Sequence, residues 1–583
     1  MNVQIYVHTQ NERLTFSCEE GEAVSSLLRE NGLLALPCGV GKCGKCLIYA
    51  STKPCTEEIN LLGSEKIAQG LRLACYTKAK ENLEITIPGR NELEVLTQYS
   101  AMDYVFDPFI KRRKVTVAEP TLDDQRPDLQ RVLDALSLDA YFLNFSKLKR
   151  LPYALRADEF NYAAVENSCF INWGKDENSY GLVIDIGTTT VAVCLINTTT
   201  GEILASVGEQ NAQAPYGADV ISRIRSEMEW QSNGCKGENP LFHAITSQID
   251  RLLQQLLHKH NLEDVDFIVF TGNTTMMHML CGIPGEFISK APFIPVLQNA
   301  QRLHAEELGI HSQAVCYLMP CISSYIGADI VASLLAANAH HPQEPFILID
   351  LGTNAEIVLS YKNKFLSCSA AAGPCFEGAT LSCGMAGQKG AIAEVCSDDE
   401  KGFTCTTIGE GEAKGICGSG VLDILALLLD KGIVDETGRL EENVPEFAKY
   451  MHDDSFYLTD KVYFSQKDIR EVQLAKSAVR AGIEILLKEA SLSFADINKL
   501  YLAGGFGSAL RKESAVRIGL IPQELGDKVH VLGNGASFGA LRYVTEAHVQ
   551  EGVKELIQKM QYIELSSHAG FSDAYIENMI FPV

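Results

Sequence analysis

The sequence has too few basic residues to balance its acidic ones, no long apolar run, and no recognisable secretory signal at its start. Its 50 lysine and arginine residues stand against 74 aspartate and glutamate residues, which gives a formal charge of −24. Such a chain has no basic excess with which to neutralise phosphates, so general binding to nucleic acid is disfavoured. Without a run of about 18 apolar residues we expect no transmembrane helix, and without a basic segment followed by an apolar one we expect no secretion.

The 18 cysteines therefore belong to a protein that we expect to be cytoplasmic. Disulfide bonds are rare in that reducing compartment, so we expect some of the cysteines to hold metal and most to be buried thiols. Hydrophobic residues make up 46% of the 583 residues and charged residues 21%, so the chain can bury sizeable cores. This length has room for about four domains, or for two large ones and smaller ones.

Residues 1–92 show short strand-like segments and turns. VQIYVH and RLTFSC predict a hairpin, and a helix is expected near Ala23–Glu30. Four cysteines of this segment have the plant-type spacing of [2Fe–2S] ligands, which is C-x4-C-x2-C with a fourth cysteine farther on. They are Cys38, Cys43, Cys46 and Cys75.

A cluster of this kind needs four thiolates and a loop that wraps closely around two iron ions. Gly39, Gly41 and Gly44 allow this wrap, in which backbone N–H groups point at the sulfurs. A zinc site or buried thiols are the alternatives, although a zinc ribbon usually shows two C-x2-C pairs, which this segment lacks. The segment resembles a plant-type ferredoxin domain over its whole length. This implies a β-grasp fold and a one-electron carrier with a potential near roughly −400 mV.

Two small segments are expected between this unit and the rest of the chain. Residues 93–125 lack clear periodicity and are predicted to be a linker, in which the basic run IKRRK is a solvated strand or linker rather than a binding patch. Residues 126–177 are predicted to form a small middle domain that packs on a neighbour, with a helix that starts at Pro127. Residues 178–583 then form the large unit.

The large unit contains a repeated pattern of an apolar strand, an Asp-x-Gly-Thr-x turn, a second strand and a turn. The two copies begin at Asp185 and Asp350. Such turns can present backbone N–H groups and hydroxyls to phosphates, and each aspartate can hold a hydrated magnesium ion. The predicted phosphate ligands are Gly187, Thr188, Thr189 and Thr190 in the first copy and Gly352, Thr353 and Asn354 in the second.

Further glycine turns follow in a fixed order around these copies. One lies at Gly327–Ala332, one opens a helix at about Gly418, one follows a strand at Leu502–Gly507, and one lies at Gly533–Gly539. This order resembles the sugar kinase, Hsp70 and actin superfamily, which implies two ribonuclease-H-like lobes with ATP in the cleft. A tight strand-to-helix turn without a ligand is the alternative for AGGFG. The nucleotide contacts predicted here are Gly418, Ser419, Gly504, Gly505 and Gly507.

Acidic residues are the candidates for magnesium and water chemistry. We expect Asp185 and Asp350 to anchor magnesium-bound water, and Asp329 and Glu356 to compete for the role of orienting the hydrolytic water or accepting its proton. Asp329 can instead cap the helix that follows it. Asn273 is expected to be structural or to form part of the cleft wall.

A ferredoxin unit fused to this ATPase fold resembles the reductive activators of corrinoid proteins, over nearly the whole chain. The motifs that carry the resemblance are CGVGKCGKC, EPTLDD, DIGTTT, FTGNTTMMHML, SSYIGADI, DLGTNAEI, AAGPCFEGATLSCGMAGQKGAI, ICGSG, YLAGGFG and MIFPV. The expected fold class is thus multidomain α/β. The resemblance implies ATP-dependent one-electron reduction of cob(II)amide to cob(I)amide on a separate corrinoid protein, which carries the cobalamin. It also implies a [2Fe–2S] cluster, ATP and Mg²⁺ as cofactors, an external low-potential electron donor and, as a family-based expectation, a homodimer.

The fusion has a physical logic. Cobalt(I) is a strong reductant, so the electron is expected to move uphill, and each ~59 mV disfavours the product about tenfold. ATP can drive this step only if nucleotide states differ in affinity for the partner or its cobalt state, and a closing two-lobed cleft is a suitable two-state element. The alternatives are a ferredoxin-linked ATPase that activates another low-potential metalloenzyme, such as a dehydratase, and a non-catalytic ATP sensor.

A glycine-rich stretch in the large unit, residues 367–390, has little hydrophobic periodicity. We expect it to be an exposed loop that approaches the corrinoid partner. It contains Cys368, Cys375 and Cys383, whose spacings fit no common cluster pattern, so a second cluster is not expected.

Overall fold

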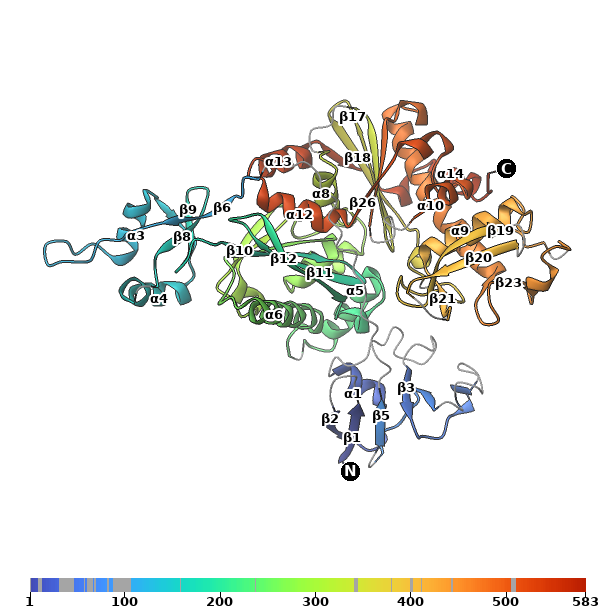
Figure 1. Ribbon diagram of the computed structural model, residues 1–583, viewed down its shortest axis with the longest axis horizontal. Helices are drawn as coiled ribbons and strands as arrows, with labels where there is room; N and C mark the ends of the chain where they lie inside the picture. Colours follow the sequence, from blue (N-terminus) through green and yellow to red (C-terminus); the bar gives the residue numbers. More distant parts are fainter. Residues whose placement is uncertain are drawn as a thin grey trace.

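The structure is a computed structural model that describes residues 2–8, 13–30, 47–56, 58–59, 67, 70–80, 83–86, 106–157, 159–235, 237–339, 344–378, 380–398, 402–409, 412–441, 444–504 and 510–582. In Figure 1 these residues form a small N-terminal unit, a second small unit and a large unit of two lobes. No helix within these ranges is both long enough and apolar enough to cross a membrane.

The N-terminal unit is a sheet with a helix packed on it. Its elements are β1 (Asn2–His8), β2 (Arg13–Glu19), α1 (Val24–Glu30), β3 (Leu47–Ala50), β4 (Leu71–Leu73) and β5 (Leu83–Thr86). The antiparallel pairing of β1 with β2 confirms the predicted hairpin, and α1 confirms the expected helix. The strand order β2-β1-β5-β3-β4, with β1 and β5 parallel, is that of a β-grasp fold.

The second small unit is a sheet with the order β6-β8-β9-β7. Its elements are β6 (Ile110–Lys114), α3 (Asp128–Leu136), β7 (Ala140–Tyr141), α4 (Phe145–Arg156), β8 (Tyr162–Glu166) and β9 (Cys169–Gly174). The helix α3 directly follows Pro127, as predicted. The strand β6 lies inside the segment 93–125, in the basic run that was expected to be a solvated strand or linker. The strand lacks apolar alternation because its buried central side chain is an arginine, Arg112.

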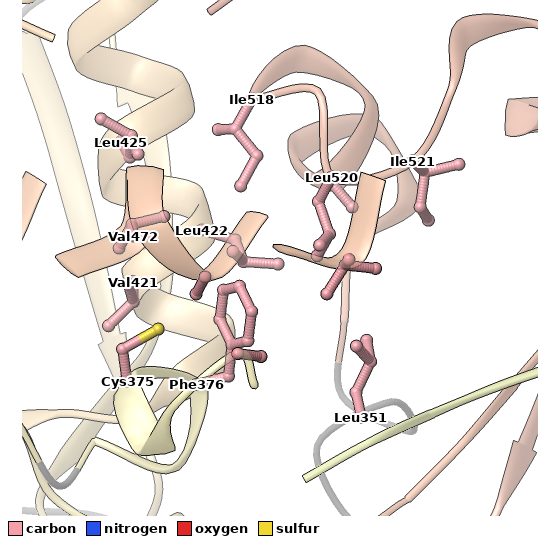
Figure 2. Close-up of a cluster of buried hydrophobic side chains, with 14 of the residues drawn as sticks. Leu351, Cys375, Phe376, Val421, Leu422, Leu425, Val472, Ile518, Leu520 and Ile521 are labelled. Carbon is pink, nitrogen blue, oxygen red and sulfur yellow. The ribbon is translucent and has the colours of Figure 1, made fainter. Parts of the chain in front are cut away.

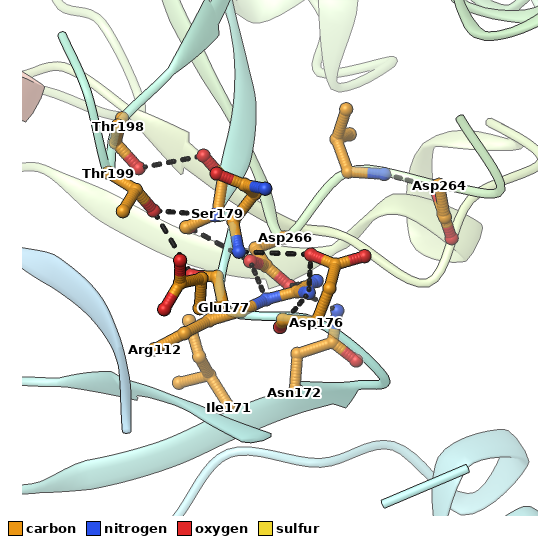
Figure 3. Close-up of polar contacts among 12 residues, drawn as sticks. Arg112, Ile171, Asn172, Asp176, Glu177, Ser179, Thr198, Thr199, Asp264 and Asp266 are labelled. Atoms are coloured by element: carbon orange, nitrogen blue, oxygen red, sulfur yellow. Dashed lines mark hydrogen bonds and ion pairs between the residues drawn. The ribbon is translucent and has the colours of Figure 1, made fainter. Parts of the chain in front are cut away.

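Asp266 of the first lobe forms hydrogen bonds and an ion pair with residues of this small unit (Figure 3). Its carboxylate has no exposed surface and accepts hydrogen bonds from Arg112 Nε and Nη2 at 2.8 and 3.0 Å. It also accepts from Asn172 Nδ2 of β9 at 2.9 Å and from Ser179 Oγ at 2.9 Å. Buried ions are stable when paired and fully hydrogen bonded, so this network fixes the small unit to the large one.

The two lobes of the large unit are each built on a mixed sheet. The first contains β10 (Tyr180–Ile186), β11 (Thr190–Asn197), β12 (Glu202–Gln210), β13 (Phe267–Gly272), β14 (Gln301–His304) and β15 (Val315–Leu318), with α5 (Val220–Ser232), α6 (Pro240–His260) and α7 (Thr274–Leu280). The second contains β16 (Phe346–Leu351), β17 (Ala355–Tyr361), β18 (Lys364–Ala370), β25 (Lys499–Ala503), β26 (Val529–Gly533) and β27 (Met560–Tyr562), with α10 (Gln466–Ala490).

The two sheets share one topology. The order β12-β11-β10-β13-β15 in the first has its counterpart in β18-β17-β16-β25-β26 in the second. In each lobe the central strand, β10 or β16, forms a hairpin with the next strand and pairs in parallel with β13 or β25. The interiors of β10 and β16 are buried continuously because both faces of each sheet are covered. This topology confirms the predicted repeat and the two ribonuclease-H-like lobes.

The second lobe also carries smaller sheets and additional helices. These elements are the 3₁₀ helix η4 (Pro374–Glu377), β19 (Ala391–Asp398), β20 (Gly402–Thr407), β21 (Gly415–Ile416), α9 (Gly418–Asp430), β22 (Met451–His452), β23 (Ser455–Tyr457), β24 (Tyr463–Ser465), α11 (Lys512–Arg517) and α14 (Phe571–Glu577). As predicted, α9 begins at Gly418.

Two helices join the lobes, α8 (Ala328–Ala336) and α12 (Gly535–Thr545), followed by α13 (Val549–Lys559). Figure 1 shows α8 and α12 between the two large sheets. Helix α8 buries Val331 in the core of the first lobe and Leu334 in a core shared with the second. A Cβ on Gly539 would lie 1.6 Å from the carbonyl oxygen of Ala332, so the two helices touch backbone to backbone and this position requires glycine.

The chain that enters the second small unit is hydrogen bonded to the end of α12. The N–H of Asp107 donates to the carbonyl of Thr545 at 2.7 Å, and the N–H of Phe109 donates to that of Val544 at 3.2 Å. The N–H of Ala547 returns a bond to the carbonyl of Asp107 at 2.7 Å. Residues 107–109 therefore form a strap along the last turn of α12.

Replacement of Asp266 by alanine is expected to lower the free energy of unfolding by about 3–5 kcal/mol, because it removes the buried counter-ion of Arg112 and leaves only the exposed Asp176 near the guanidinium. Chemical unfolding followed by circular dichroism measures this loss. The control is Glu551→Ala, which removes only an exposed pair with Lys554 and should change stability by less than about 0.5 kcal/mol. A loss below about 1 kcal/mol for Asp266→Ala would contradict the prediction.

Candidate active site

The two predicted phosphate turns close hairpins at equivalent places in the two lobes. In the first, the N–H of Gly187 donates to the carbonyl of Thr190 at 2.9 Å, and in the second the N–H of Gly352 donates to that of Asn354 at 2.9 Å. A Cβ on Gly187 would lie 2.7 Å from the oxygen of Thr190, so the first turn closes this tightly only with glycine. Both turns thus have the compact form that the sequence predicts.

Three side chains donate hydrogen bonds to oxygen atoms of the first turn. Asn211 Nδ2 donates to the carbonyl of Gly187 at 2.8 Å, and Arg223 Nη2 donates to the carbonyl of Thr188 at 2.5 Å. Asn273 Nδ2 lies 3.2 Å from Thr188 Oγ1, and the Asn273 side chain also caps α7. Asn273 is therefore both structural and in contact with the turn, while Asn211 and Arg223 carry no sequence signal of their own.

The hairpin aspartates each contact one of the helices between the lobes. Asp185 Oδ2 accepts a bond from Ser537 Oγ of α12 at 3.4 Å, and Asp350 Oδ2 accepts one from Ser333 Oγ of α8 at 3.4 Å. Desolvation raises the pKa of Asp185 to about 7, and the charge of Asp350 adds to the shift. Desolvation likewise raises the pKa of Asp350 to about 6. Burial and mutual repulsion therefore disfavour the charged forms of these two carboxylates.

Asp329 and Glu356, the two candidates for orienting water, lie in the same acidic group. Asp329 is in the first turn of α8, where desolvation and the charges of Asp350 and Asp185 raise its pKa to about 8. The N–H of Ile330 donates a hydrogen bond to Asp329 Oδ1 at 2.8 Å. Asp329 thus binds one N–H group at the start of α8, as expected of a helix cap, although the N-cap residue is Gly327. Glu356 pairs with Asp350 across the hairpin, and desolvation raises its pKa well above the ordinary value.

Glu377, which the sequence reasoning did not single out, joins the two turns. Its Oε2 accepts a hydrogen bond from Thr189 Oγ1 of the first lobe and one from Thr353 Oγ1 of the second, each at 3.2 Å. Desolvation raises the pKa of Glu377, and its bonds to Thr353 and Thr189 oppose that shift. The sequence does contain a feature that could have pointed to Glu377. It is an acidic residue that directly follows Cys375 and Phe376, in a turn that begins with Gly-Pro and ends with Gly.

The expectation of an exposed loop at 367–390 is wrong for its first half. Residues up to Ala370 belong to β18, in which Cys368 is buried, and Cys375 and Phe376 of η4 are buried in the core of the second lobe. Apolar periodicity is absent here because β18 is buried on both faces, not because the segment is exposed. Exposed side chains occur farther on, as at Ser382 and Lys389.

The remaining predicted ligands differ in where they lie. Gly504 follows β25 with φ of +92°, and a Cβ there would lie 2.7 Å from Asp350 Oδ1, so this glycine borders the second turn. Ser419 is buried at the start of α9 and donates to the carbonyl of Ala393 at 2.8 Å, so its hydroxyl is used within the second lobe. Cys75 lies just after β4 against the core of the N-terminal unit. The predicted residues that lie outside the described part of the chain are Cys38, Cys43, Cys46, Gly505 and Gly507.

Models of known families match nearly the whole chain. Residues 344–583 match the C-terminal domain of RACo, the ASKHA domain, and residues 180–342 match the RACo middle region. Residues 100–181 match the RACo linker region, and residues 7–80 match the 2Fe-2S iron-sulfur cluster binding domain.

Individual proteins are similar over two thirds or more of the chain. The chain is 28% identical, over 96% of its length and 96% of the relative, to the corrinoid activation enzyme RamQ of Eubacterium limosum. It is 26% identical, over 68% of its length and 76% of the relative, to the [Co(II) methylated amine-specific corrinoid protein] reductase of Methanosarcina barkeri. A solved structure described as a reductive activator for corrinoid, iron-sulfur protein is 30% identical and aligns with a TM-score of 0.72, covering 100% of this chain and 98% of that one.

The raised carboxyl pKa values have a consequence for stability in the absence of Mg²⁺ and nucleotide. A carboxyl group whose pKa is higher in the folded protein binds more protons there than in the unfolded chain. Stability is then greatest below the unfolded pKa, near 3.8, and falls as the pH rises through the folded pKa. For Asp185 this window runs from 3.8 to about 7.

We therefore expect the free energy of unfolding of the metal-free protein to fall between about pH 5 and pH 7. Asp185→Asn should reduce this fall by about 1–3 kcal/mol, since one proton taken up over one pH unit corresponds to about 1.4 kcal/mol. Urea unfolding at a series of pH values in EDTA measures the effect, with Asp573→Asn on the exposed face of α14 as the control. The same slope in the Asp185 variant and the wild type would refute the assignment.

Proposed function

Because this chain belongs to the family of reductive activators of corrinoid proteins, we propose that it uses ATP to drive one electron from its [2Fe–2S] cluster to the cob(II)amide of a corrinoid protein. The cob(I)amide that results serves methyl transfer. The observation that carries the nucleotide part is the meeting of the two hairpin turns from opposite lobes, whose hydroxyls converge on one carboxylate. The names of the relatives support the cobalt part.

The turns would bind the phosphate groups through their N–H groups and hydroxyls. The convergence of donors on the Glu377 carboxylate supports this, because a carboxylate and a phosphate oxygen accept the same hydrogen bonds. Arg223 adds a buried positive charge behind the first turn. Gly504, with Gly505 and Gly507, would let the chain pass close to adenosine.

Asp185 and Asp350 would hold Mg²⁺ through its bound water molecules. Mg²⁺ keeps several waters and is bound by few carboxylates in phosphate sites. When bound, it supplies the positive charge that offsets the repulsion between these aspartates. Their bonds to Ser537 and Ser333 orient the carboxylates, and they also link the metal position to α12 and α8.

Asp329 is the better of the two candidates for orienting water. The charges of the aspartates of both hairpins raise the pKa of Asp329, whereas the pKa of Glu356 is raised chiefly by burial and by the charges of Asp329 and Asp350. The bond from the Ile330 N–H holds the Asp329 carboxylate at the start of α8. A fixed carboxylate between both lobes is suited to positioning water next to the terminal phosphate.

The uphill electron transfer requires that nucleotide states differ in their affinity for the partner or for its cobalt state. The contact of α8 and α12 at Gly539 supports a pivot there, since no side chain separates the two helices. Closure of the lobes on the phosphates would change the surface that they present to the corrinoid protein.

Asp329→Asn is expected to lower partner-stimulated ATP hydrolysis at least about 100-fold, the range for loss of a positioned acid–base group. The Kd for Mg–ATP should change less than about threefold, because the phosphate donors remain. Phosphate release and fluorescence titration measure these two quantities, with Glu356→Gln as the comparison. The preference for Asp329 is wrong if Glu356→Gln alone shows the loss.

The whole function is tested by mixing the reconstituted protein, Mg–ATP, a low-potential reductant and a cobalamin-containing corrinoid protein, and following the visible spectrum. Cob(I)amide is expected to accumulate only with ATP. Cys46→Ser should abolish the cluster absorption and cobalt reduction while ATP binding remains, because the cluster and the nucleotide turns lie in different units. Cobalt reduction that is independent of ATP would contradict the proposal.

A further inference from the structure

The carboxylate of Glu377 lies between the two nucleotide turns and is bound by both. A single oxygen atom, Oε2, accepts from Thr189 Oγ1 and from Thr353 Oγ1, each at 3.2 Å. The backbone of Thr353 also hydrogen bonds to this carboxylate. Oε1 lies 3.7 Å from the position that a Cβ on Gly352 would occupy, so the carboxylate sits directly over the second turn.

These donors are the groups that the proposed function assigns to phosphate. Thr189 and Thr353 belong to the two copies of the Asp-x-Gly-Thr-x pattern, and they come from opposite lobes. Hydroxyl and N–H donors that converge on one anionic oxygen make an anion site. In the structure, therefore, a side chain of the protein itself fills the anion site between the lobes.

The position of Glu377 is fixed by the core of the second lobe. It ends η4, whose Cys375 and Phe376 are each 1% exposed. Figure 2 shows these two side chains packed beside α9, next to Val421 and Leu422. Gly378 closes η4 with φ of +76°, and a Cβ there would lie 2.5 Å from the carbonyl oxygen of Met385. The backbone before and after Glu377 is thus tightly packed, and only its side chain can leave the turns.

The surroundings of the carboxylate make it a weak occupant of this site. Its charge raises the pKa of Asp350 and of Glu356, so it adds to the repulsion within the acidic group. Among the described residues, no lysine, arginine or histidine forms an ion pair with it. Its hold on the turns therefore consists of hydrogen bonds alone, which a phosphate with more charge and more oxygen atoms can replace.

We propose that Glu377 is an internal competitor of the nucleotide's phosphate groups, and that it links the two lobes when no nucleotide is bound. This rests on the proposed function, since it requires that the turns bind phosphate. Entry of the phosphates takes over the hydroxyls of Thr189 and Thr353, and the Glu377 side chain withdraws. The nucleotide then links the lobes in place of Glu377. Nucleotide affinity is therefore set by the difference in free energy between the hydrogen bonds of the turns to phosphate and those to Glu377.

Removal of the charge should therefore strengthen nucleotide binding. Glu377→Gln keeps the size of the side chain, and we expect it to bind Mg–ATP and Mg–ADP about tenfold more tightly than the wild type, the scale of one charge-assisted hydrogen bond lost from the competing state. Adenosine, which has no phosphate, should bind the variant and the wild type equally. The control is Glu555→Gln on α13, whose carboxylate is exposed and paired only with Lys559.

Fluorescence titration with the full-length, cluster-loaded protein measures the three affinities, and thermal unfolding checks that each variant is folded. A merely structural role would change the affinities for ATP and adenosine together. Glu377→Asp, which is one methylene shorter and cannot span both hydroxyls in the same way, should tighten ATP binding by a smaller factor, and it carries the test if Glu377→Gln does not fold.

The outcomes separate the two proposals. A wild type that binds no adenine nucleotide would overturn the proposed function and this inference with it. A wild type that binds Mg–ATP, together with variants whose ATP affinity is unchanged or weaker, would overturn this inference alone: unchanged affinity would make Glu377 a bystander, and weaker affinity would make it a ligand of the metal.

Discussion

Electrostatic repulsion among carboxylates is the constraint on which the arrangement of residues between the two lobes depends. Asp185 and Asp350 end equivalent strands of the two lobes, Asp329 begins α8, and Glu356 and Glu377 approach from the second lobe. Their mutual charges raise one another's pKa values. The proposed pair of a cation and a polyanion would fit this arrangement, because the cation would neutralise the carboxylates and the polyanion would accept hydrogen bonds from the donors of the turns.

The duplication of the fold explains why these groups meet. Two copies of one topology face each other, so each strand end delivers an aspartate and a turn to the same place. Each hairpin aspartate also accepts a hydrogen bond from a helix between the lobes, through Ser537 of α12 and Ser333 of α8. Those helices touch where Gly539 meets Ala332, so the helices that contact the hairpin aspartates also contact each other.

Local patterns in the sequence predicted the fold well. The repeated strand and turn, the N-terminal hairpin and the helix starts predicted at Pro127 and at about Gly418 each depend on residues that are neighbours in the chain. Contacts between distant elements could not be predicted in this way: Glu377 acquires its role only because a buried turn brings it to both hairpins. The contact of Arg112 in β6 with Asp266 of another unit could not be predicted for the same reason, because an inward-facing arginine leaves no apolar pattern. Burial on both faces of β18 similarly produced the false expectation of an exposed loop.

The strap at residues 107–109 has a consequence for the redox unit. Through Asp107 and Phe109 the backbone is hydrogen bonded to the last turn of α12, so the chain that comes from the N-terminal unit is attached to a helix that lies between the lobes. Any rotation of α12 displaces this point of attachment. The closure of the lobes proposed above would therefore also shift the point at which the chain of the iron–sulfur unit is attached to the large unit.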